Sequence, residues 1–275
     1  MSRKVFETGI YEISNEEYHA SAGLSRSAIM EFKKTPLHYW HKYLNPAYQS
    51  KESSNEMIFG SAFHSYVLEP DTFDKYYFIA SKNPYHGNSK EGRAFKEDMK
   101  ALSRDKIILD RDDFEEIKLM TDAFMKDDYA RELIKDAEYE KSMYWIDPDT
   151  GLQCKCRPDI LHSNFVVDIK TTREASPRKF QSDFHSFGYH MQMAMIHEGI
   201  KHTQEKIVTN FIALAIEKTP PYCHAIYPLD PSVLLHGVRE FKYYLFKIKE
   251  CIEIGLWPSY ETQVISLPNY ATIGE

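Results

Sequence analysis

Residues 156–172 read CRPDILHSNFVVDIKTT, and this stretch decides the fold. Two apolar runs flank His162-Ser163-Asn164, a composition typical of two strands joined by a tight turn. Because side chains alternate between the two faces of a strand, Asp168 and Lys170 emerge side by side from an otherwise apolar run. The turn would bring Asp159, at the end of the preceding strand, next to Asp168.

Asp159, Asp168 and Lys170 together have the chemistry of a divalent-metal site. Two carboxylates that meet on a hydrophobic sheet are costly without a bound cation. Mg²⁺ prefers oxygen ligands, so the two carboxylates and the backbone carbonyl of Ile169 would suffice to hold it, with Mn²⁺ as a substitute. Lys170 would orient or help to deprotonate an attacking water, or stabilise charge in the transition state of phosphodiester hydrolysis. The alternative is a surface salt bridge between Asp168 and Lys170.

The first half of the chain is predicted to be mainly helical. Apolar residues recur at helical spacing, and prolines or polar caps mark the helix ends. One helix is expected to start at Ser25 or Ser27 and to stop at Thr35-Pro36. The other expected helices are Leu37–Leu44, Met57–Leu68, Lys90–Ser103 and Asp112–Lys135.

The second half of the chain combines strands with helices. The spacing predicts helices over Phe184–Gly199, ended by its glycine, and from Asp230 to about Ile254. A hairpin turn is expected at Asp147–Gly151. The predicted strands are Tyr139–Ile146, Leu152–Leu161, Phe165–Thr171, Ile207–Ile216 and Cys223–Pro228. They favour an α/β (α+β) fold in which a mixed five-stranded sheet is flanked by helices.

We expect one domain over residues 1–275, with a mainly helical part (1–136), a catalytic sheet core (137–229) and a C-terminal helix and tail (230–275). The composition, 43% hydrophobic and 27% charged, is that of an ordinary globular protein. No apolar run reaches the ~18 residues of a membrane span, and the N-terminus lacks the apolar core of a signal peptide. A cytoplasmic location without a membrane partner is therefore expected.

The net charge of −7 does not exclude a nucleic-acid partner. A bound metal ion brings positive charge to the phosphate, and basic residues need to line only one groove. The four cysteines are irregularly spaced, which argues against a disulfide framework. Cys154 and Cys156 share one face of a predicted strand, so we expect them in the core, and no iron–sulfur cluster is expected. The spacing of His185, His190, His197 and His202 does not place all four on one helix face, so they do not predict a zinc site.

The pattern Pro158-Asp159…Asp168-Ile169-Lys170 resembles the PD-(D/E)XK motif of restriction-endonuclease-like nucleases. Further motifs resemble RecE-type exonucleases, the exodeoxyribonuclease VIII family, and they keep their order along nearly the whole chain. The motifs are Leu24–Ala28 followed by Pro36, Gly60–His64 with Leu68–Pro70, Lys170–Thr172, Tyr189–Gln192, Trp257–Tyr260 and Leu267–Ala271. The second acid of the motif is Asp168 here, whereas many members of the superfamily use Glu.

The resemblance implies roles for residues outside the central motif. His64 matches a further metal ligand, and Lys170 matches the catalytic lysine. Gln192 and Tyr189 match a helix motif that supports the catalytic site or contacts DNA. From the residues alone, His64 is an ordinary half-buried histidine and Gln192 an ordinary polar residue on a Met-rich helix.

Phosphate contacts are expected at two further places. Ser25, Arg26 and Ser27 lie at a helix start, where free N–H groups and the helix dipole favour a phosphate. Simple N-capping is the alternative there. Thr171, which follows the predicted catalytic lysine, is expected to touch the DNA backbone.

The RecE resemblance also implies the reaction and its partners. It implies 5′→3′ digestion of double-stranded DNA ends, leaving 3′ single-stranded tails for recombination of the phage type. It further implies a RecT-like single-strand annealing partner and a ring-shaped homo-oligomer, a tetramer. The alternatives are another PD-(D/E)XK nuclease, either an endonuclease or a 3′→5′ single-strand exonuclease, and a non-catalytic DNA-binding protein of the same fold. The intact set of Asp159, Asp168 and Lys170 speaks against the non-catalytic alternative.

Overall fold

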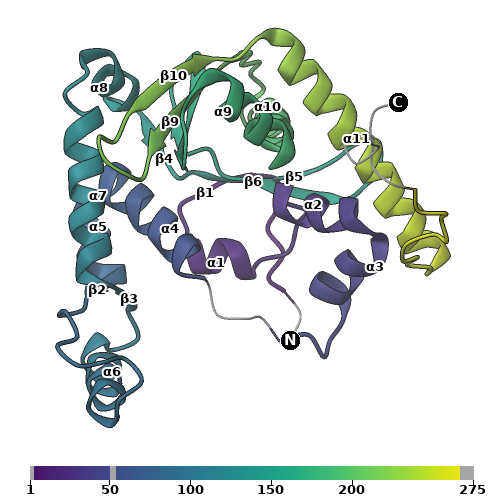
Figure 1. Cartoon of the computed structure of the whole chain (residues 1–275). Coiled ribbons are helices and arrows are strands. Elements are labelled where there is room, and N and C mark those ends of the chain that lie inside the picture. The colour runs from purple at the N-terminus through teal and green to yellow at the C-terminus, as the bar shows by residue number, and fades with distance from the viewer. Residues whose placement is uncertain (1–2, 50–53, 267–275) are drawn as a thin grey trace, which may run out of the picture.

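A five-stranded sheet lies at the centre of the computed structural model, which describes residues 3–49 and 54–266 (Figure 1). Its strand order is β10-β9-β8-β7-β4. The strands are β4 (Glu138–Tyr139), β7 (Ile160–Leu161), β8 (Phe165–Thr172), β9 (Asn210–Glu217) and β10 (His224–Pro228). β8 and β9 run parallel and the other pairs are antiparallel, so the predicted mixed five-stranded sheet is confirmed. The motif Leu267–Ala271 lies outside the described residues.

Two predicted strands are each divided between two sheets. The sequence predicts single strands over Tyr139–Ile146 and Leu152–Leu161, but only the first residue of one and the last two residues of the other belong to the central sheet. Their remaining parts form a three-stranded antiparallel sheet made of β1 (Gly9–Tyr11), β5 (Ser142–Ile146) and β6 (Gln153–Cys156). The breaks have local causes. Glu140 has a left-handed φ of 50°, and Pro158 has no N–H to donate to a strand ladder.

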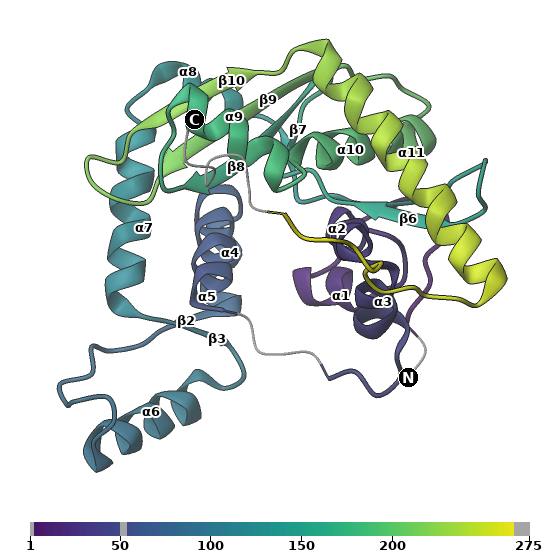
Figure 2. The same cartoon turned by 45° about the vertical axis from the view of Figure 1, so that its right-hand side comes forward.

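Helices cover both faces of the central sheet, as Figures 1 and 2 show. Strand alternation in β8 assigns its side chains to two cores: Val166 packs in one, and Val167 and Ile169 pack in the other. The first core also contains the buried Cys154 and Cys156, as the sequence predicts. Its helices are α2 (Arg26–Lys34), α9 (Pro177–Ser186), α10 (Tyr189–Gln204) and α11 (Pro231–Ile254). The helices of the second core are α4 (Asn55–Leu68), α5 (Pro70–Tyr76), α7 (Arg111–Phe124) and α8 (Asp128–Ile134).

The predicted helix Phe184–Gly199 has the wrong bounds. The structure has two helices there, α9 and α10, separated at Gly188, whose φ of 69° favours glycine. Gly199 lies inside α10 rather than at its end. A Cβ at this position would meet Cys156 Sγ at 2.6 Å, so the glycine allows α10 to approach β6 closely. The predicted helix Asp112–Lys135 is likewise divided, because Asp127 caps a new helix, α8.

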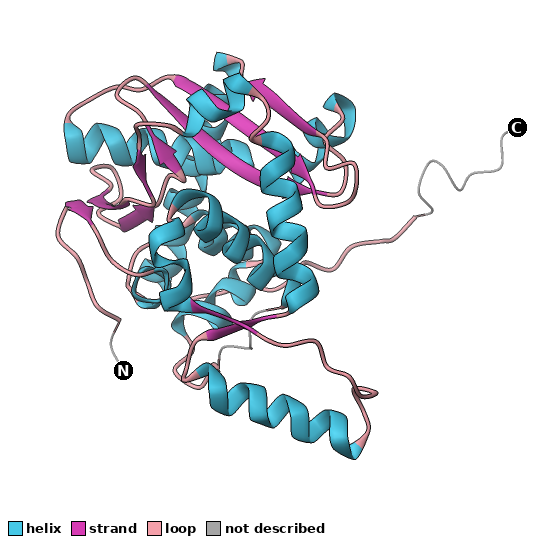
Figure 3. Ribbon diagram, turned by 90° about the vertical axis from the view of Figure 1, so that its left-hand side faces the viewer, coloured by secondary structure: helices cyan, strands magenta, loops and turns pink. Residues whose placement is uncertain are grey.

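Other predicted elements agree closely with the structure. Ser25 caps α2, Asp230 caps α11, and the hairpin turn between β5 and β6 has Gly151 at a φ of 72°. α6 (Lys90–Ser103) has the predicted bounds, and it projects from the body beyond the parallel pair β2 (Tyr77–Ile79) and β3 (Ile107–Leu109) (Figure 3). The remaining elements are α1 (Asn15–Ala20), α3 (Pro36–Tyr39) and the π-helix η1 (Trp40–Leu44). Within the described residues, no helix has the length and apolar character needed to cross a membrane.

Candidate active site

Asp159 and Asp168 lie beside each other where the pairing of β7 with β8 ends, away from the turn at residues 162–164. Asp159 lies in the loop before β7, where the Ile169 N–H donates a hydrogen bond of 2.8 Å to its Oδ2. This bond joins the loop to β8 at the position between Asp168 and Lys170. Asp168 is fully buried, and Asp159 is 6% exposed. The structure therefore brings together the two carboxylates that the sequence selects.

Lys170 and Gln192 hold the Asp168 carboxylate from two sides. Lys170 Nζ lies 2.5 Å from Asp168 Oδ2 and 3.9 Å from Asp159 Oδ2. Gln192 extends from α10 and donates a hydrogen bond of 2.8 Å to Asp168 Oδ1. Lys170 Nζ also donates to the carbonyl of Ile169 at 3.3 Å, so that carbonyl borders the same group of side chains.

His64 approaches Asp159 from the face of the sheet opposite the one that α10 covers. It belongs to α4, and its Nδ1 lies 3.6 Å from Asp159 Oδ1 and 3.8 Å from Glu140 Oε1. His64, Glu140 and Asp159 each offer a ligand atom within 4.8 Å of the others. The residue motifs of the sequence include His64 but not Glu140.

Glu140 is a site residue that the sequence analysis missed. Its left-handed φ of 50° takes it out of the strand ladder, and its N–H donates to the carbonyl of Asp159 at 3.2 Å. An acidic side chain that interrupts the strand-like run 139–146 was the available indication. The conformation that turns it toward His64 depends on the pairing of β4 with β7, which the local sequence does not reveal.

The electrostatics of the site reflect a surplus of buried negative charge. Burial raises the pKa of Asp168 to about 6, with the neighbouring Asp159 adding to the rise and Lys170 opposing it. Burial acts to lower the pKa of Lys170, but the two carboxylates outweigh it and the pKa is raised, which keeps the lysine cationic. For His64, burial again acts to lower the pKa, and Asp159 and Glu140 outweigh it, so the pKa is raised.

The donor set fits a hard divalent cation. Gln192 Oε1 is a buried acceptor without a hydrogen-bond partner among the described residues, and the buried Asp168 Oδ2 is contacted by the Lys170 ammonium at 2.5 Å. Oxygen atoms of Asp159, Asp168 and Glu140 would dominate the ligands, with one nitrogen from His64. Such a set suits Mg²⁺ or Mn²⁺.

Of the predicted DNA-contact residues, Tyr189 and Arg26 lie near Lys170, whereas Thr171 faces away from it. The Tyr189 ring lies under both Lys170 Nζ, 5.0 Å from its centroid, and the Arg26 guanidinium, at 5.6 Å. Ser25 caps α2 by accepting from the Ala28 N–H, as its capping alternative predicts. Thr171 is half-buried, and strand alternation turns it to the face of β8 opposite Lys170.

A basic pocket of about 430 Å³ adjoins Arg26 at the start of α2. Ser27 lines it, and Glu31 lies in it as the partner of two lysines. The other lining residues are Met30, Lys33, Lys34 and Lys42. Arg26 itself donates to the carbonyl of Phe187 at 3.3 Å and forms no ion pair within the described residues.

Comparison with known proteins identifies the family of this fold. Residues 25–266 match the model of a family described as a PDDEXK-like domain of unknown function (DUF3799). No curated protein matches the sequence. A solved structure of a putative exonuclease from Eubacterium rectale is similar, with 15% identity, a TM-score of 0.59 and coverage of 95% of this chain and 99% of that one. An alkaline exonuclease from Laribacter hongkongensis matches at 13% identity, with a TM-score of 0.28 and coverage of 70% and 95%.

The family match spans the whole segment from α2 to the end of α11 and includes Asp159, Asp168 and Lys170. The structural likeness to the Eubacterium rectale protein shows the same fold over nearly all of both chains. The predicted PD-(D/E)XK core is thereby confirmed, and the chain belongs to the PDDEXK-like family DUF3799.

Proposed function

We propose that the protein is a divalent-metal-dependent exodeoxyribonuclease. The observation that carries this proposal is the convergence of two buried carboxylates, Asp159 and Asp168, with Lys170 and His64 at the end of the β7–β8 pair away from its turn. Membership of the PDDEXK-like family supports a nuclease. The name of the Eubacterium rectale neighbour, a putative exonuclease, favours cleavage from the ends of a nucleic acid.

Each residue of the site has a part in this chemistry. Asp159, Asp168 and His64 would hold the cation, with Glu140 or the carbonyl of Ile169 completing its ligands. When bound, a divalent cation supplies positive charge to the scissile phosphate and makes water more acidic. The residues of the chain position the reacting groups around it.

Lys170 acts as an electrostatic stabiliser in this proposal. Because the carboxylates keep it cationic, it stabilises the negative charge that develops on the phosphate rather than accepting a proton from water. Gln192 orients the Asp168 carboxylate through its hydrogen bond to Oδ1. This bond leaves Asp168 Oδ2 directed to the lysine and to the cation.

The DNA strand would reach the site along Tyr189 and Arg26. Tyr189 presents an aromatic face next to Lys170, which suits stacking by a base or sugar at the reacting nucleotide. Arg26, Ser27 and the lysines of the basic pocket offer positive charge and N–H donors to the adjacent phosphates.

The RecE-type motifs support a more specific proposal. It comprises Mg²⁺ as the natural cation, 5′→3′ digestion of duplex ends, 3′ single-stranded tails for recombination, and a RecT-like annealing partner. It also comprises a ring-shaped homo-oligomer, which would gather the basic pockets of several net-acidic chains around one DNA duplex.

Labelled DNA tests the direction of digestion. The chain is incubated with Mg²⁺ and linear duplex DNA that carries a label at either the 5′ or the 3′ end, with closed circular duplex as the control. We expect early release of the 5′ label, late release of the 3′ label and an intact circle. Early release of the 3′ label would contradict the proposed direction, and cleavage of the circle would identify an endonuclease instead.

A further inference from the structure

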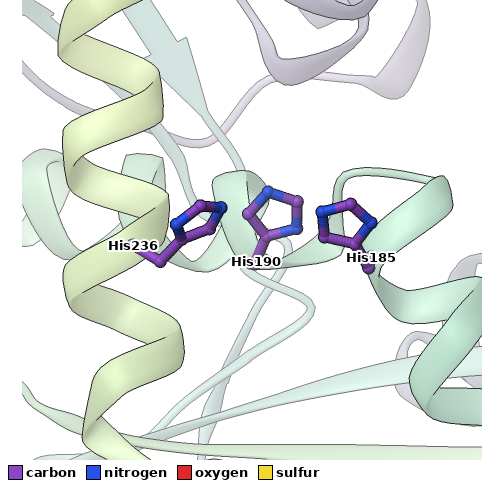
Figure 4. A group of neighbouring side chains, drawn as sticks. All are labelled: His185, His190 and His236. Atoms are coloured by element: carbon purple, nitrogen blue, oxygen red, sulfur yellow. The ribbon is translucent and has the colours of Figure 1, made fainter.

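Three histidines from three different helices meet on the side of the molecule where α10 and α11 pack together (Figure 4). His185 lies in the last turn of α9, His190 in the first turn of α10 and His236 in α11. Their ring centroids are 5.2 Å (185–190), 5.3 Å (190–236) and 6.4 Å (185–236) apart. One nitrogen from each ring lies within 4.8 Å of the other two.

The neighbours of His190 leave one of its ring nitrogens available to a metal ion. It is 3% exposed, and its Nε2 lies 2.5 Å from Glu240 Oε2, while Lys33 holds the other oxygen of Glu240 at 2.5 Å. A carboxylate held in this way accepts a hydrogen bond from the Nε2–H of the neutral ring, so the lone pair of the ring is on Nδ1. Nδ1 is buried and has no hydrogen-bond partner among the described residues. A carboxylate on one ring nitrogen and a cation on the other is the usual arrangement of metal-binding histidines.

Burial also keeps His190 in the form that binds a metal. It lowers the pKa of the imidazole, although Glu240 opposes the change, so the ring is neutral at neutral pH. His185 and His236 are exposed, and the Nε2 of His236 lies 3.9 Å from Glu240 Oε2. Nitrogens bound to one zinc ion at ~2.0–2.1 Å lie closer together than 4.8 Å, so the two exposed rings would rotate toward the buried one on binding.

We propose that His185, His190 and His236 bind a transition-metal ion, Zn²⁺ in the first instance, with Glu240 holding His190 from behind or adding a fourth ligand. Three imidazoles suit Zn²⁺, whereas the oxygen-rich site at Asp168 suits Mg²⁺, so the two sites select different ions. The ion would tie α9 and α11 to the first turn of α10. That turn carries Tyr189 and, two residues after His190, Gln192.

Two histidines of the sequence series do not belong to this cluster. His197 Nδ1 bonds the carbonyl of Val208 at 2.7 Å, and His202 Nε2 lies 3.5 Å from Glu198 Oε2. The third member of the cluster is His236, which is distant in the sequence and lies beside His190 because α11 packs against α10. The spacing within 185–202 therefore could not reveal the site.

Metal titration of the full chain tests the proposal without reference to nuclease activity. The untagged, metal-free protein is titrated with Zn²⁺ by calorimetry and with Co²⁺ by visible absorption, in millimolar Mg²⁺ to fill the Asp168 site. We expect one equivalent of Zn²⁺ and the absorption bands of four-coordinate Co²⁺. We also expect Zn²⁺ to raise the melting temperature.

Variants separate this site from the candidate active site. His236→Ala removes an exposed side chain and leaves the core intact, and we expect it to lose the zinc equivalent, the Co²⁺ bands and the thermal shift. His190→Ala should do the same, whereas His64→Ala and the exposed control His86→Ala should keep all three. No binding by the wild-type chain would overturn the proposal. So would binding that survives His236→Ala or disappears in His64→Ala.

Discussion

Asp168 has no solvent exposure and three charged or polar neighbours, and their balance determines what the site can bind. Lys170 supplies a positive charge at 2.5 Å, and Gln192 supplies a hydrogen-bond donor at 2.8 Å. Asp159 adds a second carboxylate, which makes the charged form of Asp168 costly. A divalent cation would relieve this cost more completely than the single charge of the lysine.

Replacement of Gln192 tests its positioning role. Gln192→Ala removes the donor to Asp168 Oδ1, so we expect the pKa of Asp168 to rise further and the rate of DNA hydrolysis to fall about tenfold. The pH–rate profile should move to higher pH, which a purely structural change would not cause. Gln181→Ala, at an exposed position of α9, is the control. An unchanged profile in Gln192→Ala would show that the bond does not tune Asp168.

The affinity for Mn²⁺ should fall at low pH. The pKa of Asp168 is raised by burial to about 6, and that of His64 is raised above 6.5 because Asp159 and Glu140 outweigh burial. Both groups must lose their proton to bind the ion. Affinity is therefore full only above the raised pKa of His64, and it falls further as the pH drops through about 6, where Asp168 takes up its proton, by ~10-fold per pH unit for each proton taken up.

Calorimetry with Mn²⁺ between pH 5.5 and 8 measures this dependence. His64→Ala should reduce the slope of log affinity against pH by about one proton. A flat profile in the wild-type chain would mean that Asp168 does not hold the ion.

At the scale of elements, local rules predict β8, the turns that border it and most of the helix ends. They also place Asp168 and Lys170 on one face, because alternation is a property of the strand itself. They fail where the chain leaves one sheet and enters another, at Glu140 and at Pro158. The residues before and after each of these positions have similar strand-like compositions, so the change of sheet cannot be predicted from them. Glu140 was missed for the same reason. His64 reaches Asp159 only through the packing of α4, and only its resemblance to a family motif pointed to it.

The close packing of α10 and α11 depends on Gly237. A Cβ at this position would meet the backbone carbonyl oxygen of His190 at 2.3 Å, and backbone cannot move aside. We expect Gly237→Ala to lower the free energy of unfolding by about 1–3 kcal/mol, measured by urea denaturation. Gly60→Ala is the matched control, because a Cβ there meets nothing within 4 Å, and a gain of about 0.5–1 kcal/mol is expected. Equal effects of the two substitutions would contradict the helix contact.

At the scale of the whole molecule, a chain of net charge −7 must bind DNA through local positive charge. The basic pocket at the start of α2 is such a place, although each of its three lysines forms an ion pair with Glu31 or Glu240. Arg26 contributes a guanidinium that no carboxylate of the described residues neutralises, and it lies over the same tyrosine ring as Lys170.

The salt dependence of DNA binding tests the role of Arg26. We expect Arg26→Ala to weaken binding equally for all sequences and to reduce the slope of log affinity against log salt by about 1. Arg111→Ala, on α7 and paired with Glu115, should leave the slope unchanged. Equal slopes in the two variants would remove Arg26 from the DNA path.

The most direct test of the metal-nuclease claim is the rate at which linear duplex DNA is degraded in Mg²⁺. The wild-type chain is compared with Asp168→Asn, Lys170→Ala and the control Asp149→Asn, whose side chain lies in the exposed hairpin turn. Circular dichroism checks that each variant is folded. We expect activity in the wild-type and Asp149→Asn chains only, with a loss of about 100-fold or more in the other two. An inactive wild-type chain, or site variants that match it, would contradict the assignment.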